Sequence, residues 1–422
     1  MGVPTDSPQH SYLHQTDPGT RILGRCDALA AISEPGKGVA RLYLTDEHKK
    51  AIALVSGWMR EAGMEVRVDE AANVIGRYAP AREGAQYLLL GSHIDSVIDA
   101  GKYDGPLGVV CAIDCVSVLN QEQRRLPFGI EIVAFGDEEG TRFGTTLIGS
   151  RAMTGSLDPD ELALADKSGI SIAAAMRGFG IDPAAIRNAA RDPKDILAYV
   201  EVHIEQGPVL ESEDLPVGIV TSISAQIRKR VTLVSEPNHA GTVPMRLRHD
   251  PFLAAAEIAL AAERIAAGIA DAVATVGQVD VRPGAMNVIP GQVTISLDMR
   301  ARADATLQAM VGRIDEEIAR IAQARGVAMK TETVLETLSA PCSPQLIARL
   351  DDAVRGAGIK PLHLPSGAGH DGMAMARLAP IGMLFVRCRK GISHSPLESV
   401  TAADVTVAAD VLQRLVRDLA VG

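Results

Sequence analysis

The chain has 422 residues, with 47% hydrophobic residues, 22% charged residues and a formal net charge of −10 at pH 7. This length exceeds one ordinary hydrophobic core, so two domains are expected. The acidic balance excludes the positive footprint that nucleic-acid binding requires. No apolar stretch is long enough to cross a membrane. Residues 1–20 are polar and lack the apolar core of a signal peptide, so we expect a loose leading segment there.

In chain order, the first predicted elements alternate between helix and strand. Apolar residues recur at helical spacing between Thr45 and Ala62, and Gly63 is suited to end that helix. The following elements are expected at Met64–Val68, Val74–Tyr78 and Tyr87–Leu90 (strands), Pro106–Leu119 (helix) and Ile130–Phe135 (strand). Such alternation predicts an α/β sheet with helices on both faces.

The pattern changes near residue 217. Strands are predicted at Val217–Ser222, Arg230–Val234, Val273–Val279, Gln292–Met299 and Val327–Glu332, with helices at Asp250–Ala266 and Ala303–Ala324. Two helices interleaved with antiparallel strands are typical of a small ferredoxin-like α+β domain. Alternation resumes with helix Gln345–Ala357, strand Ile381–Val386 and helix Thr401–Leu419. We therefore predict a discontinuous catalytic domain, residues 1–216 and 338–422, and an inserted domain, residues 217–337.

The five cysteines are scattered along the chain without a CxxC pair. An odd number at irregular spacing favours free thiols in a reducing cytoplasm over a disulfide framework. Cys111 and Cys115 lie in an apolar run, which is more typical of core residues on one helix face than of a metal pair. We therefore expect a cytoplasmic protein.

The first chemical signal follows the predicted strand Tyr87–Leu90, in the run GSHID. His93 there lies at the carboxyl end of a strand, where open α/β sheets bind ligands. Asp95 can accept the second imidazole N–H of His93, which would fix its tautomer and raise its basicity as a metal ligand. Asp104 stands between glycines in GKYDG, so its carboxylate can turn inward and bridge two cations. Alone, Asp104 is equally consistent with a surface loop.

Three consecutive acids, Asp137, Glu138 and Glu139, follow the predicted strand Ile130–Phe135. Carboxylates crowded at a buried strand end repel one another, and a divalent cation removes that cost. One glutamate can then bind metal while its neighbour takes a proton from water. Alone, the same run is typical of a solvated acidic turn.

Two more histidines follow predicted strands. His203 ends an alternating apolar and polar run, and His394 lies in the turn-rich loop GISHSP. A lone histidine of this kind is more often structural. Taken together, five nitrogen and oxygen donors can hold two divalent metal ions. Zinc or manganese is expected, and cobalt or nickel also suits such a set. The predicted ligands are His93, Asp104, Glu139, His203 and His394.

In series, these motifs resemble the M20 metallopeptidase superfamily, and within it the hydantoinase/carbamoylase branch. The resemblance covers residues from about 21 to 419. It rests on the segments GSHIDSVIDAGKYDGPLGV, AFGDEEGTRF, YVEVHIEQGPVLE, NHAGTVPM, RPGAMNVIPG, SGAGHD and GISHSPLE. The chain departs from the family pattern at Ser96, Gly372, Ser395 and the stretch Ala225-Gln226-Ile227-Arg228, none of which is a predicted metal ligand.

The resemblance implies an aminopeptidase-like di-metal catalytic domain with an inserted domain that pairs subunits in a homodimer. It implies that Glu138 is the general base. Gln206 would bind the substrate amide, and His239 would polarise the scissile carbonyl, often from across the dimer. Arg300 would bind a carboxylate through its planar fork, although alone it resembles a surface arginine. The ligand sets would be Asp104, Glu139 and His394 for one ion and His93, Asp104 and His203 for the other, with Asn287, Gly369 and His370 as further substrate positions.

These implications predict a hydrolase of carbon–nitrogen bonds other than peptide bonds. Allantoate is the first expected substrate, hydrolysed at its ureido group to ammonia and carbon dioxide as in allantoate deiminases. N-carbamoyl-L-amino acids and ureidoglycolate are the alternatives, because the pocket chemistry would barely differ. A non-catalytic binding protein on the same scaffold is a hypothesis of another class, which loss of the base or of a ligand would favour. Glu138 and all five expected ligands are present.

Overall fold

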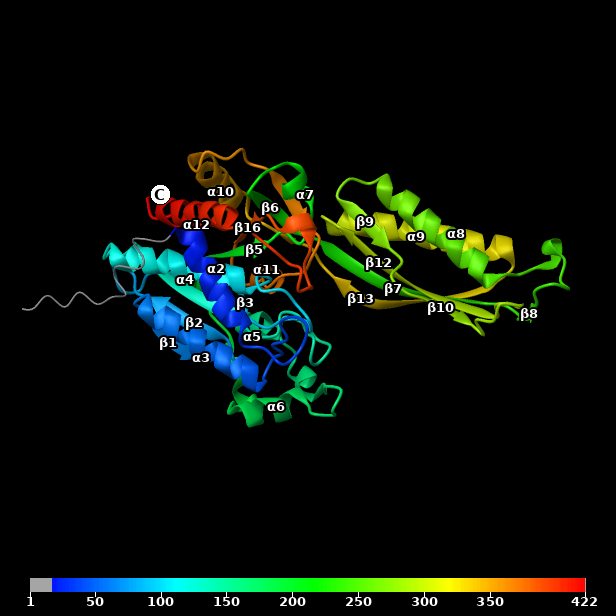
Figure 1. Ribbon diagram of the computed structural model, residues 1–422, viewed down its shortest axis with the longest axis horizontal. Helices are drawn as coiled ribbons and strands as arrows, with labels where there is room; N and C mark the ends of the chain where they lie inside the picture. Colours follow the sequence, from blue (N-terminus) through cyan, green and yellow to red (C-terminus); the bar gives the residue numbers. More distant parts are fainter. Residues whose placement is uncertain (1–16, 422) are drawn as a thin grey trace, which may run out of the picture. The chain divides into compact units, whose positions relative to one another are not determined.

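The computed structural model describes residues 17–421 and divides them into two compact units (Figure 1). Of the described residues, unit 1 contains those up to Thr221, Cys342–Leu364 and those from His370 onward. Unit 2 contains Ser222–Pro341 and the short segment Pro365–Gly369. No helix among the described residues combines the length and apolar character of a membrane span.

Unit 1 is built on a mixed sheet with a parallel centre. Strand β3 pairs in parallel with both β4 and β5, and β5 pairs in parallel with β16. Every residue of β4 and β16 is buried, so both faces of the sheet are covered, as predicted. The sheet order is β1 (Glu65–Val68), β2 (Val74–Tyr78), β4 (Gly129–Phe135), β3 (Tyr87–His93), β5 (Ile196–Ile204), β16 (Ile381–Val386), β6 (Val217–Ile223) and β14 (Ala340–Pro341), with β15 (His363–Ser366) also beside β6.

Helices pack on this sheet and on one another. Helix α4 packs on the parallel strands, while α10 and α12 pack on β16 and α3 on β1 and β2. The helices of unit 1 are α2 (Pro18–Ala30), α3 (Asp46–Glu61), α4 (Pro106–Gln121), α5 (Ile148–Met153), α6 (Ile172–Phe179), α7 (Val209–Ser212), α10 (Pro344–Gly356), α11 (Gly372–Met375) and α12 (Ala402–Asp418). Short 3₁₀ helices lie at Pro159–Ala163, Pro183–Ala189, Pro193–Asp195 and Arg389–Gly391.

The predicted loose segment is wrong for residues 17–20. Helix α2 begins at Pro18, and the Asp17 carboxylate caps it by accepting from the Thr20 N–H at 3.0 Å. An aspartate followed by proline is a helix-start pattern in its own right. The helix is amphipathic and packs on α4 and α12. The rest of the predicted segment, residues 1–16, lies outside the described residues.

Unit 2 contains a five-stranded antiparallel sheet with the order β10–β12–β7–β13, in which β9 also pairs with β12. Helices α8 and α9 pack on one face of this sheet. The chain order of its main elements is β7 (Ala225–Val234), α8 (Pro251–Ala267), β9 (Ala272–Thr275), β10 (Val279–Arg282), β12 (Gln292–Ala301), α9 (Asp304–Arg325) and β13 (Ala328–Thr337). A 3₁₀ turn (Met245–Leu247) and a two-stranded ribbon of β8 (Asn238–His239) and β11 (Val288–Ile289) complete the unit.

One predicted strand, Val273–Val279, is two strands in the structure. Both β9 and β10 pair with β12, but the ladder is interrupted between them. There the Gln278 N–H donates to the Ser296 side-chain oxygen at 3.0 Å instead of to a backbone carbonyl. The side-chain bond compensates for the missing ladder bond. An alternating hydrophobic pattern cannot predict this interruption, because it depends on a side chain of another strand.

A buried arginine ties the end of α2 to the loop after β3. Arg41 is 1% exposed, and its guanidinium donates to the carbonyl oxygens of Ile94, Leu29 and Ile32. Replacing Arg41 with Met would remove the donor from the Ile94 and Ile32 carbonyls, each costing about 1–3 kcal/mol, while the Leu29 carbonyl keeps the Ile32 backbone N–H at 3.1 Å.

We expect Arg41→Met to lower the free energy of unfolding of unit 1 by about 3 kcal/mol or more. Urea unfolding followed by the fluorescence of Trp58, the single tryptophan of the chain, reports on unit 1. The control Arg60→Met alters an exposed arginine on α3 and should change stability by less than about 0.5 kcal/mol. Equal urea midpoints for the two variants would contradict the bridging role of Arg41.

Candidate active site

The parallel strands of unit 1 bring the predicted motifs to one edge of the sheet. His93, the last residue of β3, is paired in register with Phe135, the last residue of β4. His203 near the end of β5 is paired with Phe385 of β16. The acidic run follows β4 directly, so it emerges at the same carboxyl edge, where side chains of α/β sheets meet their ligands.

Asp104 lies at the centre of the resulting cluster. Its Oδ1 is 3.5 Å from His93 Nε2 and 3.2 Å from His203 Nε2. These three side chains are buried. The other oxygen, Oδ2, is 3.4 Å from His394 Nε2, which in turn lies 3.5 Å from Glu139 Oε1. The two oxygens of one carboxylate therefore face two separate donor groups.

The spacing of these donors fits divalent metal ions. Metal–nitrogen and metal–oxygen bonds of ~2.1 Å at tetrahedral angles separate neighbouring ligand atoms by roughly 3.4 Å. The nitrogen–oxygen distances around Asp104 are 3.2–3.5 Å. Imidazole and carboxylate donors without a thiolate suit zinc or manganese better than copper(I) or an iron–sulfur cluster. The predicted ligand residues thus meet in a geometry and chemistry that suit two cations.

Asp95 holds two of the site's motifs together. Its Oδ1 is 3.4 Å from His93 Nδ1, on the side of the ring away from Asp104. The same carboxylate accepts from the backbone N–H groups of Glu138 at 3.0 Å and Glu139 at 3.2 Å. Burial alone raises the pKa of Asp95, but its bonds to His93 and these N–H groups hold the pKa below its usual value. A charged Asp95 can therefore orient the His93 ring as expected of a ligand's supporting acid.

Glu138 and Glu139 have strongly perturbed acidities. Burial and, to a smaller extent, the charge of the nearby Asp104 raise the pKa of Glu139 to about 8. Burial also raises the pKa of Glu138 well above its usual value, and Glu139 adds to the shift. A carboxylate oxygen of Glu138 lies within 4.8 Å of donor atoms of His93 and Glu139. A partly buried glutamate with a raised pKa beside the donor groups can accept and return a proton near neutral pH.

Three residues at this edge have a strained backbone conformation. Asp137, Gln206 and His394 have positive φ angles of 61°, 55° and 53°, a region that side chains other than glycine rarely adopt. Gly105 has φ 82°, and a Cβ there would lie 2.5 Å from the His93 ring. Glycine is therefore required directly after Asp104 for the imidazole to fit. Such strain is typical of functional sites, where the surrounding structure holds it in place.

Several site residues were not singled out from the sequence. The Ser393 hydroxyl donates a short hydrogen bond to Asp104 Oδ2. Glu398 Oε1 accepts from the backbone N–H groups of Tyr103 at 2.7 Å and Asp104 at 3.2 Å. Both belong to the motif GISHSPLE, so that motif carried the signal, but only the fold reveals that they hold Asp104. The buried Glu201 also offers an oxygen near His203 and His370.

The proposed amide-binding residue, Gln206, contacts the donor cluster itself. Its Nε2 donates to Asp104 Oδ2 at 2.7 Å and to Ser393 at 3.1 Å, while its buried Oε1 makes no hydrogen bond among residues 17–421. His370 is buried, its ring is 4.4 Å from that of His203, and burial lowers its pKa well below the usual value. His370 is therefore neutral, and its ring packs against that of the predicted metal ligand His203. Gly369 ends the short segment assigned to unit 2.

The remaining predicted substrate residues lie in unit 2, at two distant positions. His239 and Asn287 are neighbours in the β8–β11 ribbon, where the Ala240 N–H donates to the Asn287 carbonyl at 2.9 Å. Arg300 lies near the opposite end of β12, and its guanidinium donates to Asp298 and to the Gly367 carbonyl. The strand from Gln292 to Arg300 alone spans roughly 27 Å at ~3.3 Å per residue. Asn287 and Arg300 of one chain therefore do not converge on one small molecule.

Comparison with known proteins agrees with this arrangement. Residues 89–418 match the model of peptidase family M20/M25/M40. The chain is 44% identical to the N-carbamoyl-L-amino acid amidohydrolase of Geobacillus stearothermophilus, over 96% of this chain and 99% of that protein. It is 39% identical to the allantoate deiminase of Arabidopsis thaliana, over 96% of this chain and 83% of that protein.

The fold has a similar solved counterpart. A crystal structure of a hydantoinase/carbamoylase family amidase from Burkholderia multivorans superposes with a TM-score of 0.90 and 32% identity, over 96% of this chain and 98% of that one. The resemblance inferred from the motifs is thereby confirmed, as is a mixed α/β fold of the kind these amidases have. The chain belongs to peptidase family M20/M25/M40, and its relatives include amidohydrolases of the hydantoinase/carbamoylase type.

Proposed function

We propose that this chain is a metal-dependent amidohydrolase that hydrolyses the carbamoyl carbon–nitrogen bond of a small ureido carboxylate and releases ammonia and carbon dioxide. The observation that carries the proposal is the arrangement around Asp104, whose two oxygens face His203 and His394 at 3.2 and 3.4 Å. A carboxylate in that position suits a pair of divalent cations, zinc or manganese first and cobalt or nickel as alternatives. The relatives named as amidohydrolases support the reaction class.

Allantoate is the first proposed substrate, which makes the activity allantoate deiminase-like. N-carbamoyl-L-amino acids are the close alternative, since relatives of both names are similar to this chain over nearly its whole length. Ureidoglycolate shares the same two groups, a ureido carbon and a carboxylate. All three would make the same demands on the site: donors for the ureido oxygen, a base near neutral pH and a cationic clamp.

The proposed roles follow from the chemistry of each side chain. Divalent cations at such a site lower the pKa of a water molecule toward ~7 and polarise a carbonyl. Asp104, Glu139 and the three histidines would hold them. Glu138 would take a proton from the attacking water and return it to the leaving nitrogen, the task for which its raised pKa suits it. Gln206 would bind the substrate amide, and Arg300 would bind the carboxylate end-on.

We further propose that the inserted unit pairs two copies of the chain. The distance between Asn287 and Arg300 within one chain supports this, because a homodimer allows the ribbon of one copy to serve the substrate held by Arg300 of the other. His239, in the same ribbon, would then polarise the carbonyl across the dimer. Several large apolar side chains of unit 2 that are more than half exposed also favour a partner surface, among them Met245, Leu247, Leu260 and Met286.

We expect Glu138→Gln to lower turnover by about 10³-fold or more while the content of bound metal stays unchanged, because only the proton acceptor is lost. Ammonia release from allantoate and from N-carbamoyl-L-amino acids in the presence of Mn²⁺ measures turnover, and elemental analysis measures metal. Glu83→Gln makes the same change at an exposed position and should retain full activity. Glu138→Gln turnover within twofold of wild type would remove Glu138 from its role. Two bound metals without turnover of any ureido, amide or peptide substrate would favour a binding protein.

Cation binding should also depend on pH. Burial raises the pKa of Glu139 to about 8, so the metal-free protein holds a proton there at neutral pH. For His203, burial lowers the pKa, but the hydrogen bond to Asp104 more than offsets this, and the pKa is raised. Both groups must lose their proton to bind metal, so affinity is highest above pH ~8 and falls as the pH drops below it.

We expect the affinity for Mn²⁺ to fall by up to about tenfold per pH unit and per displaced proton between pH 8 and 6. Calorimetric titration of chelator-treated protein in two buffers of different ionisation enthalpy gives both the affinity and the number of protons released. An affinity that stays constant over this range, with a heat independent of the buffer, would show that the donor groups are already deprotonated.

A further inference from the structure

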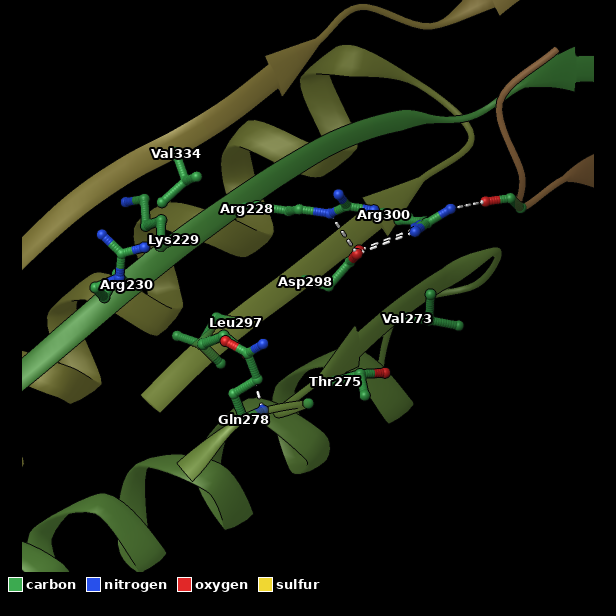
Figure 2. A pocket seen from close by; sticks show the side chains of 13 residues that line it. Arg228, Lys229, Arg230, Val273, Thr275, Gln278, Leu297, Asp298, Arg300 and Val334 are labelled. Carbon is green, nitrogen blue, oxygen red and sulfur yellow. Dashed lines mark hydrogen bonds and ion pairs between the residues drawn. The ribbon is translucent and has the colours of Figure 1, made fainter. Parts of the chain in front are cut away.

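A cavity of about 710 Å³ opens on the sheet of unit 2 (Figure 2). It lies on the face whose side chains alternate with those buried under α8 and α9, since Ile227 and Leu297 are buried while their neighbours point away. Arg228, Asp298 and Arg300 line this cavity. Arg230 and Lys229 also line it, so the wall carries three guanidinium groups, one ammonium group and one carboxylate.

Asp298 connects this group. Its Oδ1 accepts from Arg300 Nε at 2.9 Å, and its Oδ2 accepts from Arg300 Nη2 at 3.0 Å. The same Oδ2 accepts from Arg228 Nε at 2.9 Å and from Gln226 Nε2 at 2.8 Å. Strand register explains the cluster, because Asp298 is paired with Arg228 and Arg300 with Gln226 on adjacent strands. Partial burial alone raises the pKa of Asp298, but the bonds to Arg300 and Arg228 hold it below its usual value, so the carboxylate is charged.

The arrangement leaves the outer end of Arg300 available. A guanidinium has five N–H donors. Asp298 accepts from Nε and from one Nη2 hydrogen, and the Gly367 carbonyl accepts from one Nη1 hydrogen at 2.6 Å. One N–H remains on each terminal nitrogen, which is the number that a carboxylate accepts in a two-point contact. Arg228, with a half-exposed side chain, adds a second positive charge beside it, so the pair exceeds the charge of Asp298 by one.

We propose that Asp298 is a positioning residue that fixes the Arg300 guanidinium with its outer N–H pair turned to the cavity, and that Arg228, held by the same carboxylate, makes the site selective for an anionic substrate end. The inference rests on the proposed function of Arg300 and deepens it. Asp298 accepts from Nε and Nη2 of Arg300, along one side of the guanidinium, and does not itself touch substrate. The stretch Ala225-Gln226-Ile227-Arg228, where the sequence departs from the family pattern, supplies two of the four members of this cluster.

The test is the steady-state kinetics of Asp298→Asn with allantoate or an N-carbamoyl-L-amino acid, and with the neutral carboxamide of the same compound. We expect KM for the carboxylate to rise by about tenfold or more, with kcat changed by less than about threefold, because binding and not chemistry is affected. The preference for carboxylate over carboxamide should shrink by the same factor. In an Arg300→Ala background, Asp298→Asn should add no further rise in KM, since its effect acts through Arg300.

A matched control exists on the neighbouring strand. Asp280 accepts from Arg282 Nε at 2.8 Å with the same two-residue spacing, and neither residue lines the cavity. Asp280→Asn should keep the wild-type KM. A second variant, Arg228→Gln, leaves Asp298 bonded to Arg300 and should raise KM by about threefold or more. This variant keeps the test informative if Asp298→Asn does not fold.

The kinetic results distinguish the roles of Asp298 and Arg228 from the proposed function on which they rest. Wild-type turnover of a ureido carboxylate, with Asp298→Asn and Arg228→Gln kinetically equal to Asp280→Asn, would overturn the roles of Asp298 and Arg228 and leave the proposed function standing. A loss of kcat at unchanged KM in Asp298→Asn would overturn positioning of a binding group. A wild-type protein without activity on any ureido carboxylate would overturn both.

Discussion

The structure of unit 1 depends on one constraint, which is that the Asp104 carboxylate must remain charged while buried among histidines. Burial alone raises its pKa, but hydrogen bonds from His203 and His93 hold the pKa well below its usual value. The Glu398 carboxylate fixes the backbone of Asp104, and Gly105 leaves room for the His93 ring. Neighbouring carboxylates add like charge at the same edge. Cations between these donors would relieve that repulsion, which is why the cluster is best understood as a binding site.

The order of the strands in the sheet brings the residues around Asp104 together. Parallel strands β3, β4, β5 and β16 end at one edge, so residues distant in sequence meet there without a long side chain. The loops that follow carry the positive φ angles of Asp137, Gln206 and His394. Unit 2 contributes a different chemistry, since Asp298 organises Arg228 and Arg300 by cross-strand pairing. In the proposed function, hydrolysis is carried out by residues of unit 1 and carboxylate recognition by residues of unit 2.

Hydrophobic periodicity predicted much of the fold, including the bounds of β2 and β16 and the first residue of α4. The motifs predicted which side chains would meet at Asp104, because each follows a strand. Other features depend on tertiary pairing and leave little trace in the sequence. The break between β9 and β10 depends on a side chain of another strand, and the link from Asp298 to Arg228 depends on register. Helix α2 was not predicted, although Asp17 followed by proline indicates the start of a helix. Its apolar face is explained only by its packing on α4 and α12.

We propose that Asp104 serves two cation sites in one chain. Titration of chelator-treated protein with Mn²⁺, followed by calorimetry and elemental analysis, counts those sites directly. We expect two tightly bound ions per chain in the wild type and loss of tight binding at both sites in Asp104→Asn, because both donor groups share this carboxylate. A single ion per chain, or two ions retained by Asp104→Asn, would contradict it.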